Sequence, residues 1–480
     1  MTGVPSIIQG GMGVAISGWR LARAVASRGH VGVVSGTALD TVLVRRLQLG
    51  DAGGEIRRAL GQFPDGNVVA ELLGRYYVPG GMATSAQPAP LPMYTAKATD
   101  RRQSVAVAAG FVEVFLAKEG HAGSVGINFL EKVQLPTPAT LYGALLAGVD
   151  YVLVGAGIPR DVPGLLDGLL RHDRVCLPLH VTGATPADEY VLTFDPRRVL
   201  SLRSWPPLRR PRFLAIVASA TLAASLARHG GRVDGFIVEG PTAGGHNAPP
   251  RGPLTLSGDG EPVYGPRDAV DLGRMREIGL PFWLAGSCGT PEGLRHAQAE
   301  GAAGVQVGTL FALCEESGLD PSLRARVFDA VRRGEVLVFT DPLASPTGFP
   351  FKVLRLEGTL SEAEVYASRA RRCDLGYLRE IYRRPDGRLG YRCPGEPISG
   401  YVRKGGRIEA TRGRKCICSG LLATPGLGLR RADGPEPAIV TSGNDLRGVA
   451  RLLAAGKADY TAADVIAYLT GQSHQDGANV

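Results

Sequence analysis

The segment FWLAGSCGTP at residues 282–291 indicates the fold most clearly, because it joins a short apolar strand, a turn of small residues and a helix start. The segment GVQVGT at residues 304–309 opens the next unit in the same way, with a strand that ends in a glycine and a hydroxyl residue. In (β/α)8 barrels the loops after strands seven and eight commonly hold a phosphate, which the free N–H groups at a helix start attract. The predicted phosphate ligands are Gly286, Ser287, Cys288, Gly308 and Thr309. The alternative is that these glycines only form turns.

Short β-branched segments alternate with helical ones from Pro5 to about Leu313, which is typical of βα units in a parallel sheet. The strand candidates are Ile7–Gln9, Val31–Ser35, Val125–Phe129, Tyr151–Gly155, Val175–Val181, Phe213–Ala218, Phe236–Glu239, Phe282–Ala285 and Val305–Gly308. These are nine candidates for the eight places of a barrel. We therefore predict that Val175–Val181 pairs with Val191–Phe194 in an insertion near residues 175–210.

The fold class is accordingly predicted to be α/β, with a TIM-type (β/α)8 barrel over residues 1–340. A proline-rich loop near residues 75–100 interrupts the alternation, and loops of this length are binding segments or disordered excursions. The alternation stops after about residue 340. Residues 341–480 are predicted to form a C-terminal mixed α/β appendage that ends in a loose, polar tail over residues 471–480.

Helix and turn signals predict several further elements. Thr137-Pro138 and Thr290-Pro291 open helices that Gly148 and Gly301 close. The features predicted for the appendage are a helix from a capping box at Ser361–Glu364 toward Arg372, a hairpin turn at Pro385-Asp386-Gly387, and a pair of helices at Asp445–Ala455 and Thr461–Leu469.

Composition narrows the class of protein. Glycine accounts for 66 of the 480 residues, which suits many tight turns and close approaches of backbone to a ligand. The formal charge is +9, but no nucleic-acid-binding signature accompanies it, so we expect no nucleic-acid partner. No apolar run reaches the length of a membrane span and no export signal is readable, so we expect a cytoplasmic protein whose seven cysteines are reduced.

A histidine candidate for catalysis follows the strand that ends at Glu239. The loop EGPTAGGHN at residues 239–247 presents His246 after Gly244 and Gly245, at the end of a strand where barrel enzymes keep catalytic groups. The near-neutral pKa of histidine suits proton transfer at physiological pH. The alternative is a loop histidine that only caps backbone groups.

A third glycine-rich turn, QGGMG at residues 9–13, ends the first strand. Its spacing does not match a dinucleotide-binding fingerprint, and the chain contains no Walker-type phosphate loop. Small residues at this place still let the backbone lie against an aromatic ligand.

Taken together, these motifs resemble the nitronate monooxygenase family, whose members are FMN-binding barrels. The matching segments are Pro5–Met12, Gly126–Asn128, Glu239-Gly240 with Gly244–His246, Ala285–Ser287 and Val305–Thr309. The chain departs from the usual family pattern at Ser287 and Cys288, at Asn247 and in the insertion that follows Tyr151–Gly155. These departures bear on the substrate more than on the cofactor.

The resemblance implies FMN as cofactor and His246 as the catalytic base. The cofactor-binding residues that it implies are Gln9, Gly10, Gly11, Met12, Asn128, Gly244, Gly245, Gly286, Ser287, Cys288, Gly289, Gln306, Gly308 and Thr309. Among these, the turn at Gln9–Met12 would pack by the isoalloxazine ring and Asn128 would hydrogen-bond the flavin.

Three functions stay open. The first is oxidation of a nitronate or a similar carbanion with dioxygen. The second is NAD(P)H-dependent reduction of carrier-bound enoyl thioesters. This function is considered because the chain is also similar to FMN-dependent enoyl-acyl-carrier reductases. These include the enoyl reductase component of polyunsaturated fatty acid synthases. The third is a non-catalytic flavin-binding partner of a synthase. We expect a small-molecule or carrier-bound acyl substrate, with dioxygen or NAD(P)H as the second reactant. We expect no membrane partner, and a homodimer is possible.

The cysteines of the appendage allow two interpretations. Cys373, Cys393, Cys416 and Cys418 are numerous enough for a tetrahedral zinc site. Paired Cys-x-x-Cys knuckles are absent, so the site prediction includes no metal, and buried free thiols are the alternative.

Overall fold

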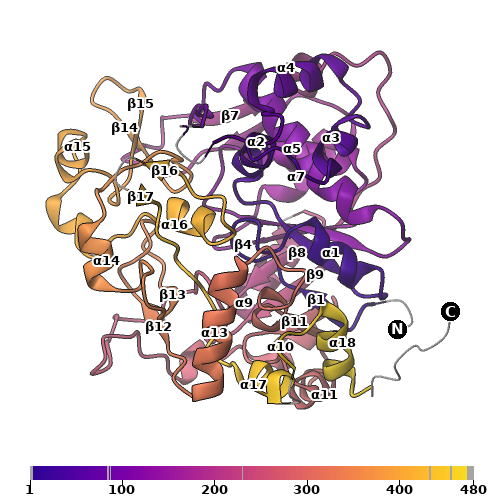
Figure 1. The fold of residues 1–480 in the computed structure, drawn as a ribbon, viewed down its shortest axis with the longest axis vertical. Helices are drawn as coiled ribbons and strands as arrows, with labels where there is room; N and C mark the ends of the chain where they lie inside the picture. The colour runs from indigo at the N-terminus through magenta and orange to yellow at the C-terminus, as the bar shows by residue number, and fades with distance from the viewer. Residues whose placement is uncertain are drawn as a thin grey trace.

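Eight parallel strands form one closed barrel in the computed structural model, which describes residues 4–83, 86, 88–229, 231–431, 434–454 and 457–472 (Figure 1). The strands, in spatial order, are β1 (Ile7–Gln9), β11 (Gly304–Val307), β10 (Phe282–Ala285), β9 (Gly235–Glu239), β8 (Arg212–Val217), β4 (Tyr151–Gly155), β3 (Val125–Leu130) and β2 (Gly32–Ser35). The barrel closes because Ile8 forms a parallel bridge with Val31, whose carbonyl accepts a hydrogen bond of 2.9 Å from the N–H of Gln9. The predicted TIM-type (β/α)8 barrel is confirmed.

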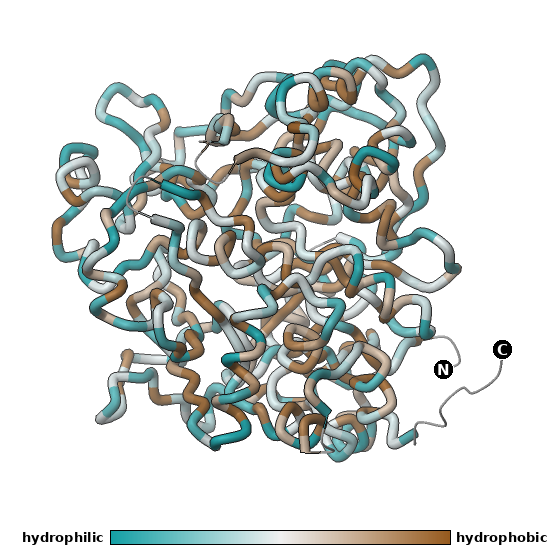
Figure 2. Tube along the Cα trace, in the orientation of Figure 1, coloured by the Kyte–Doolittle hydropathy of each residue, from teal (hydrophilic) through white to brown (hydrophobic). Residues whose placement is uncertain are grey.

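Apolar side chains fill both faces of the barrel sheet. One cluster takes alternate residues from the strands and fills the interior, with Ile8, Val33, Leu153, Leu214, Ile237 and Trp283 among its members. A larger cluster joins the outer faces of the strands to the surrounding helices. Strands buried on both faces are apolar along their whole length, which is why they stand out in the sequence. Figure 2 shows hydrophobic segments through the centre of the molecule and hydrophilic ones on the outer loops.

Helices surround the barrel, as the alternation in the sequence predicts. The helices that precede residue 340 are α1 (Trp19–Ala26), α2 (Leu39–Gln48), α3 (Glu55–Leu60), α4 (Gly66–Tyr76), α5 (Asp100–Lys118), α6 (Thr137–Leu146), α7 (Val162–Leu170), α8 (Pro196–Val199), α9 (Ala220–His229), η1 (Pro266–Asp268), α10 (Leu272–Glu277), α11 (Pro291–Ala299), α12 (Thr309–Ala312) and α13 (Pro321–Arg333). The hydroxyl of Thr290 accepts a hydrogen bond from the N–H of Gly293, and Gly301 has a left-handed φ of 80°. The predicted start and end of this helix are confirmed.

The insertion near residues 175–210 contains a two-stranded antiparallel sheet. Strand β5 (Val175–Pro178) pairs with β7 (Val191–Phe194), so the predicted pairing is confirmed. The short strand β6 (Val181–Thr182) pairs in parallel with β14 (Glu380–Arg383), which belongs to the C-terminal region. The insertion is therefore joined to the residues that follow the barrel.

The C-terminal region combines short sheets and helices. Its elements are β12 (Val338–Asp341), β13 (Phe351–Leu354), α14 (Ala363–Ser368), β14, β15 (Leu389–Arg392), α15 (Ile398–Arg403), η2 (Ile408–Thr411), α16 (Ile417–Ala423), β16 (Arg430–Arg431), β17 (Gly434–Pro435), α17 (Arg447–Ala454) and α18 (Ala462–Thr470). The hairpin β14–β15 and the helical pair α17–α18 are confirmed. The domain boundary near residue 340 stays a prediction, and residues 473–480 of the predicted loose tail lie outside the described residues.

The predicted capping box at Ser361 is wrong. Helix α14 begins at Ala363 after Glu362 and ends at Ser368, short of Arg372. The hydroxyl of Ser361 instead donates to the carbonyl of Leu356 over 3.1 Å. The side chain is therefore held by a turn before the helix and does not cap the helix itself.

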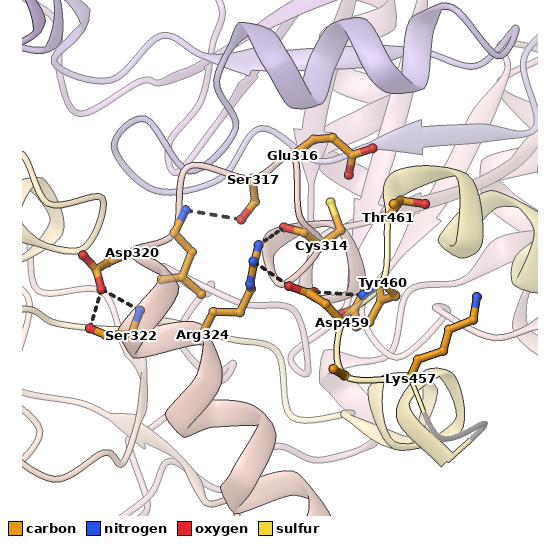
Figure 3. Close-up of polar contacts among 12 residues, drawn as sticks. Cys314, Glu316, Ser317, Asp320, Ser322, Arg324, Lys457, Asp459, Tyr460 and Thr461 are labelled. Atoms are coloured by element: carbon orange, nitrogen blue, oxygen red, sulfur yellow. Dashed lines mark hydrogen bonds and ion pairs between the residues drawn. The ribbon is translucent and has the colours of Figure 1, made fainter. Parts of the chain in front are cut away.

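The segment between the last two helices, α17 and α18, is held against α12 and α13, which follow β11 (Figure 3). Arg324 forms an ion pair of 2.6 Å with Asp459 and also donates to the carbonyl of Cys314 over 3.0 Å. The hydroxyl of Tyr460 donates to the carbonyl of Leu310 over 2.9 Å. These contacts attach the C-terminal helices to the segment directly after the predicted phosphate loop.

Candidate active site

One cavity at the carboxyl ends of the barrel strands collects almost all of the predicted site residues. Fourteen of the fifteen line it. They are Gly10, Gly11, Met12, Asn128, Gly244, Gly245, His246, Gly286, Ser287, Cys288, Gly289, Gln306, Gly308 and Thr309. The carboxyl ends of parallel strands meet at one rim, which explains why loops far apart in the sequence converge here.

Gln9 is the exception, because its side chain lies buried behind the cavity. Its Oε1 accepts a hydrogen bond of 2.9 Å from the N–H of Val33, and its Nε2 donates to Ser17 Oγ over 2.8 Å. Ser17 Oγ in turn contacts the carbonyl of Gly10 and the N–H of Met12. Gln9 therefore shapes the turn at residues 10–12. Contrary to the expectation, it does not line the cavity.

Two amide oxygens in the cavity have no hydrogen-bond partner within the described part of the chain. Asn128 donates from Nδ2 to the carbonyl of Gly11 over 3.3 Å, but its Oδ1 is buried and unpaired. Gln306 has an unpaired Oε1 as well. Buried acceptors without a donor cost free energy, so both oxygens fit a ligand that carries N–H or O–H groups.

The loop after β10 has the backbone of an anion site. Gly286 and Ser287 both have left-handed φ angles, of 97° and 54°. Among the described residues no hydrogen bond involves the N–H groups of Ser287, Cys288 or Gly289, and α11 begins two residues later. Successive free N–H groups of this kind, next to a helix start, bind phosphate oxygens.

The thiol of Cys288 is not activated. Burial, with a smaller contribution from the charge of Asp445, raises its pKa to about 11. The thiol donates to the carbonyl of Gly286 over 3.2 Å. Cys288 therefore stays protonated at neutral pH and serves packing and loop geometry.

His246 is held from the side by residues that the sequence did not indicate. Its Nε2 lies 2.7 Å from Ser345 Oγ, and its ring centre lies 4.8 Å from that of Phe351. The N–H of Lys352 donates to the carbonyl of Gly245 over 3.0 Å, so the strand β13 fixes the histidine loop. Burial lowers the pKa of His246 to about 4, which keeps the imidazole neutral at physiological pH.

A C-terminal segment, residues 441–445, completes the wall of the cavity. The N–H of Gly443 donates to Thr309 Oγ1 over 3.0 Å, and the N–H of Gly245 donates to Thr441 Oγ1 over the same distance. Thr441, Ser442, Gly443 and Asp445 all line the cavity. In the sequence this run shows only the polar, glycine-containing composition of a loop, which does not tell where the loop lies.

The four cysteines of the C-terminal region are free thiols. Cys373 and Cys393 share a hydrogen bond, which lowers the pKa of Cys373 and raises that of Cys393. In the part of the chain that the structure describes, no three His, Cys, Asp or Glu side chains are grouped to hold a metal ion. Within the same residues, no helix is long and apolar enough to cross a membrane.

Comparison with known proteins adds two sequence matches. The family model for nitronate monooxygenase matches residues 212–340, which contain His246 and both predicted phosphate loops. A dehydrogenase of a 5-hydroxy-7a-methyl-1-oxo-octahydro-1H-indene-4-carboxyl-CoA from Mycobacterium tuberculosis is 33% identical over 138 residues. That match covers 29% of this chain and 34% of the relative, so it spans about a third of the relative's length.

The comparison with solved structures matches three enzymes, among others. Nitroalkane oxidase from Streptomyces ansochromogenes is 15% identical, with a TM-score of 0.47 and coverage of 97% of this chain and 94% of that chain. FabK from Thermotoga maritima is 18% identical, with a TM-score of 0.39 and coverage of 74% and 72%. The enoyl reductase domain of MlnA from Bacillus amyloliquefaciens is 12% identical, with a TM-score of 0.37 and coverage of 74% and 64%.

The barrel, its cavity and the sequence matches support an oxidoreductase of the (β/α)8 class. Over residues 212–340 the chain resembles nitronate monooxygenase.

Proposed function

We propose that this protein is an FMN-dependent oxidoreductase of nitronate monooxygenase type, which oxidises a nitronate or a similar carbanion with dioxygen. The observation that carries the proposal is the convergence of three features in one cavity. These are free N–H groups at residues 287–289, unpaired amide oxygens on Asn128 and Gln306, and the neutral imidazole of His246.

The cavity residues fit FMN by their chemistry. The N–H groups of Ser287, Cys288 and Gly289 would take the phosphate, together with the loop at Gly308 and Thr309. The unpaired oxygen of Asn128 would accept a hydrogen bond from the ring system. Gly11 has no room for a side chain, since a Cβ atom would lie 2.3 Å from the Cβ of Asn128, so this wall is shaped by backbone.

His246 is the proposed base. Nε2 of the ring contacts Ser345, which leaves Nδ1 to accept the α-proton of a neutral nitro compound, so that the nitronate forms in the cavity. An imidazole that is neutral above about pH 4 is ready to accept this proton without first losing one. FMN, when bound, supplies the redox chemistry by which two electrons pass from the substrate to dioxygen.

A second candidate is a thioester substrate. The Mycobacterium tuberculosis relative acts on a carboxyl-CoA compound, and it shares 33% identity over 138 residues. A carbon next to a thioester carbonyl is acidic in the same sense as a carbon next to a nitro group, so the same base suits both. Under this alternative the proton moves the other way: NAD(P)H would provide a hydride for the β-carbon of an enoyl thioester, and His246 would support protonation of the α-carbon.

One anaerobic experiment separates these functions. The purified flavin-loaded protein is mixed with a nitronate or with NADPH, and loss of the flavin absorbance is followed. The proposal predicts rapid loss with the nitronate and slow loss with NADPH, whereas the reverse favours enoyl reduction. No loss with either favours a non-catalytic flavin-binding partner, and turnover unchanged by His246→Ala would show that His246 is not the base.

A further inference from the structure

We propose that Glu239 is a protonated hydrogen-bond donor of this cavity, and that the charge of the buried Lys352 opposes this protonation. In this assignment the protonated carboxyl group of Glu239 donates a hydrogen bond to an oxygen of the substrate's nitro or thioester group. His246 meanwhile takes the proton from the neighbouring carbon. The role in the reaction rests on the function proposed above, whereas the protonation of Glu239 does not.

The position of Glu239 is that of a catalytic residue in a barrel. It is the last residue of β9, paired in register with Ala285 of β10, and the N–H of Gly240 donates to the carbonyl of Ala285 over 2.9 Å. This pairing fixes the backbone at the rim, and Glu239 lines the same cavity as His246. No hydrogen bond or ion pair of its carboxyl group occurs within the described ranges of the chain.

Lys352 carries the positive charge that acts on this carboxyl group. It lies on β13, next to the histidine loop, and only 1% of its surface is exposed. Its Nζ donates to Thr340 Oγ1 over 2.7 Å, and the N–H of Thr340 donates to Glu261 Oε1 over 2.5 Å. No carboxylate of the described residues lies within salt-bridge distance of Nζ. A buried ammonium without an ion-pair partner is costly, so its charge depends on nearby acids.

The electrostatics agree with this geometry. Burial raises the pKa of Glu239 to about 8, and the positive charge of Lys352 acts in the opposite direction. Burial lowers the pKa of Lys352 to about 8, against the charges of Glu261 and Glu239. The other titratable groups nearby are Tyr264, whose pKa burial raises to about 12, and the neutral His246. A carboxyl group with a pKa of about 8 is protonated at pH 7, which is the state that the proposal requires.

Infrared spectroscopy of the purified protein tests the protonation directly, whatever its flavin content. We expect a protonated-carboxyl band that disappears with a midpoint near pH 8 and is missing from Glu239→Gln. The control Glu277→Gln, which changes an exposed glutamate at the end of α10, keeps the band. In Lys352→Met, which removes the opposing positive charge, the midpoint moves to higher pH. A band that titrates at ordinary acidic pH, or that survives in Glu239→Gln, overturns the proposal.

The pH dependence of turnover tests the role in the reaction. We expect the rate of substrate-driven flavin reduction to fall above about pH 8 in the original protein, as Glu239 loses its proton. Glu239→Gln, whose amide N–H can still donate the hydrogen bond but does not titrate, is expected to bind FMN normally, to react within about 10-fold of the original rate and to lose this alkaline limb. An unchanged alkaline limb in a yellow, active Glu239→Gln protein overturns this inference alone. A protein that binds no flavin but shows the band titrating near pH 8 overturns the proposed function and leaves the protonation of Glu239 standing.

Discussion

The Nε2 atom of His246 lies 2.7 Å from the Oγ atom of Ser345, although the two residues are 99 positions apart in the chain. Ser345 is fully buried, and its hydroxyl also contacts the hydroxyl of Thr347 at 2.8 Å. Together with the ring of Phe351, these hydroxyl groups fix the orientation of the imidazole. A segment beyond the barrel strands thus determines which ring nitrogen faces the substrate.

Ser345→Ala is expected to slow substrate-driven flavin reduction by about 5-fold to 10-fold, because one hydrogen bond to the imidazole is lost. FMN affinity should stay the same, since Ser345 does not line the cavity. Stopped-flow reduction rates and a flavin titration measure both quantities. Ser368→Ala, at an exposed position, is the control. Equal rates in the two variants would show that Ser345 does not position the base.

The acid side of the pH profile should reflect His246. Because burial lowers its pKa to about 4, the imidazole is neutral above that pH and becomes protonated below it. The rate of flavin reduction is therefore expected to change little between about pH 5 and pH 7 and to fall as the pH drops through about 4. An acid limb centred near the ordinary histidine value of 6.5 would contradict the buried setting of the ring.

Gly11→Ala should weaken FMN binding by at least about 10-fold. The added Cβ would lie 2.3 Å from the Cβ of Asn128, so the amide that faces the cavity must move. Quenching of FMN fluorescence on binding gives the dissociation constant. The matched control is Gly66→Ala at the start of α4, where no atom lies within 4 Å of the added Cβ. Equal affinity in the two variants would argue against a ligand beside Asn128.

Asp445→Asn should tighten FMN binding a few-fold at low salt. The carboxylate of Asp445 lines the cavity near Cys288 and is paired with Arg447 over 2.6 Å. The substitution removes a negative charge near the proposed phosphate site and frees the positive charge of Arg447. Because salt screens such interactions, the gain should shrink at high ionic strength. Weaker binding, or a gain that salt leaves unchanged, would place the phosphate elsewhere.

The barrel and most of the candidate site were accessible from sequence because their signals are local. Strands such as Tyr151–Gly155 are apolar throughout, and the turns at residues 10–12 and 286–289 follow strands directly. Parallel strands all end at one rim, so separate loops could be assigned to one cavity without knowledge of their contacts.

The residues that escaped prediction depend on contacts between distant segments. Thr441 lines the cavity from beyond residue 340, where the alternation that identifies the barrel has ended. From the same region, Ser345 and Lys352 hold the histidine loop. The family resemblance assigns Gln9 to the cofactor site, but its amide group instead bridges Val33 and Ser17. The hydroxyl of Ser361 was similarly taken up by a neighbouring turn.

The most direct test of the account is the flavin content of the purified protein. After incubation with FMN and removal of the excess, absorbance and extraction of the bound compound give the number of FMN molecules per chain. We predict a yellow protein with one FMN per chain, and a lower content in Gly11→Ala than in Gly66→Ala. A colourless protein that takes up no FMN would contradict the account.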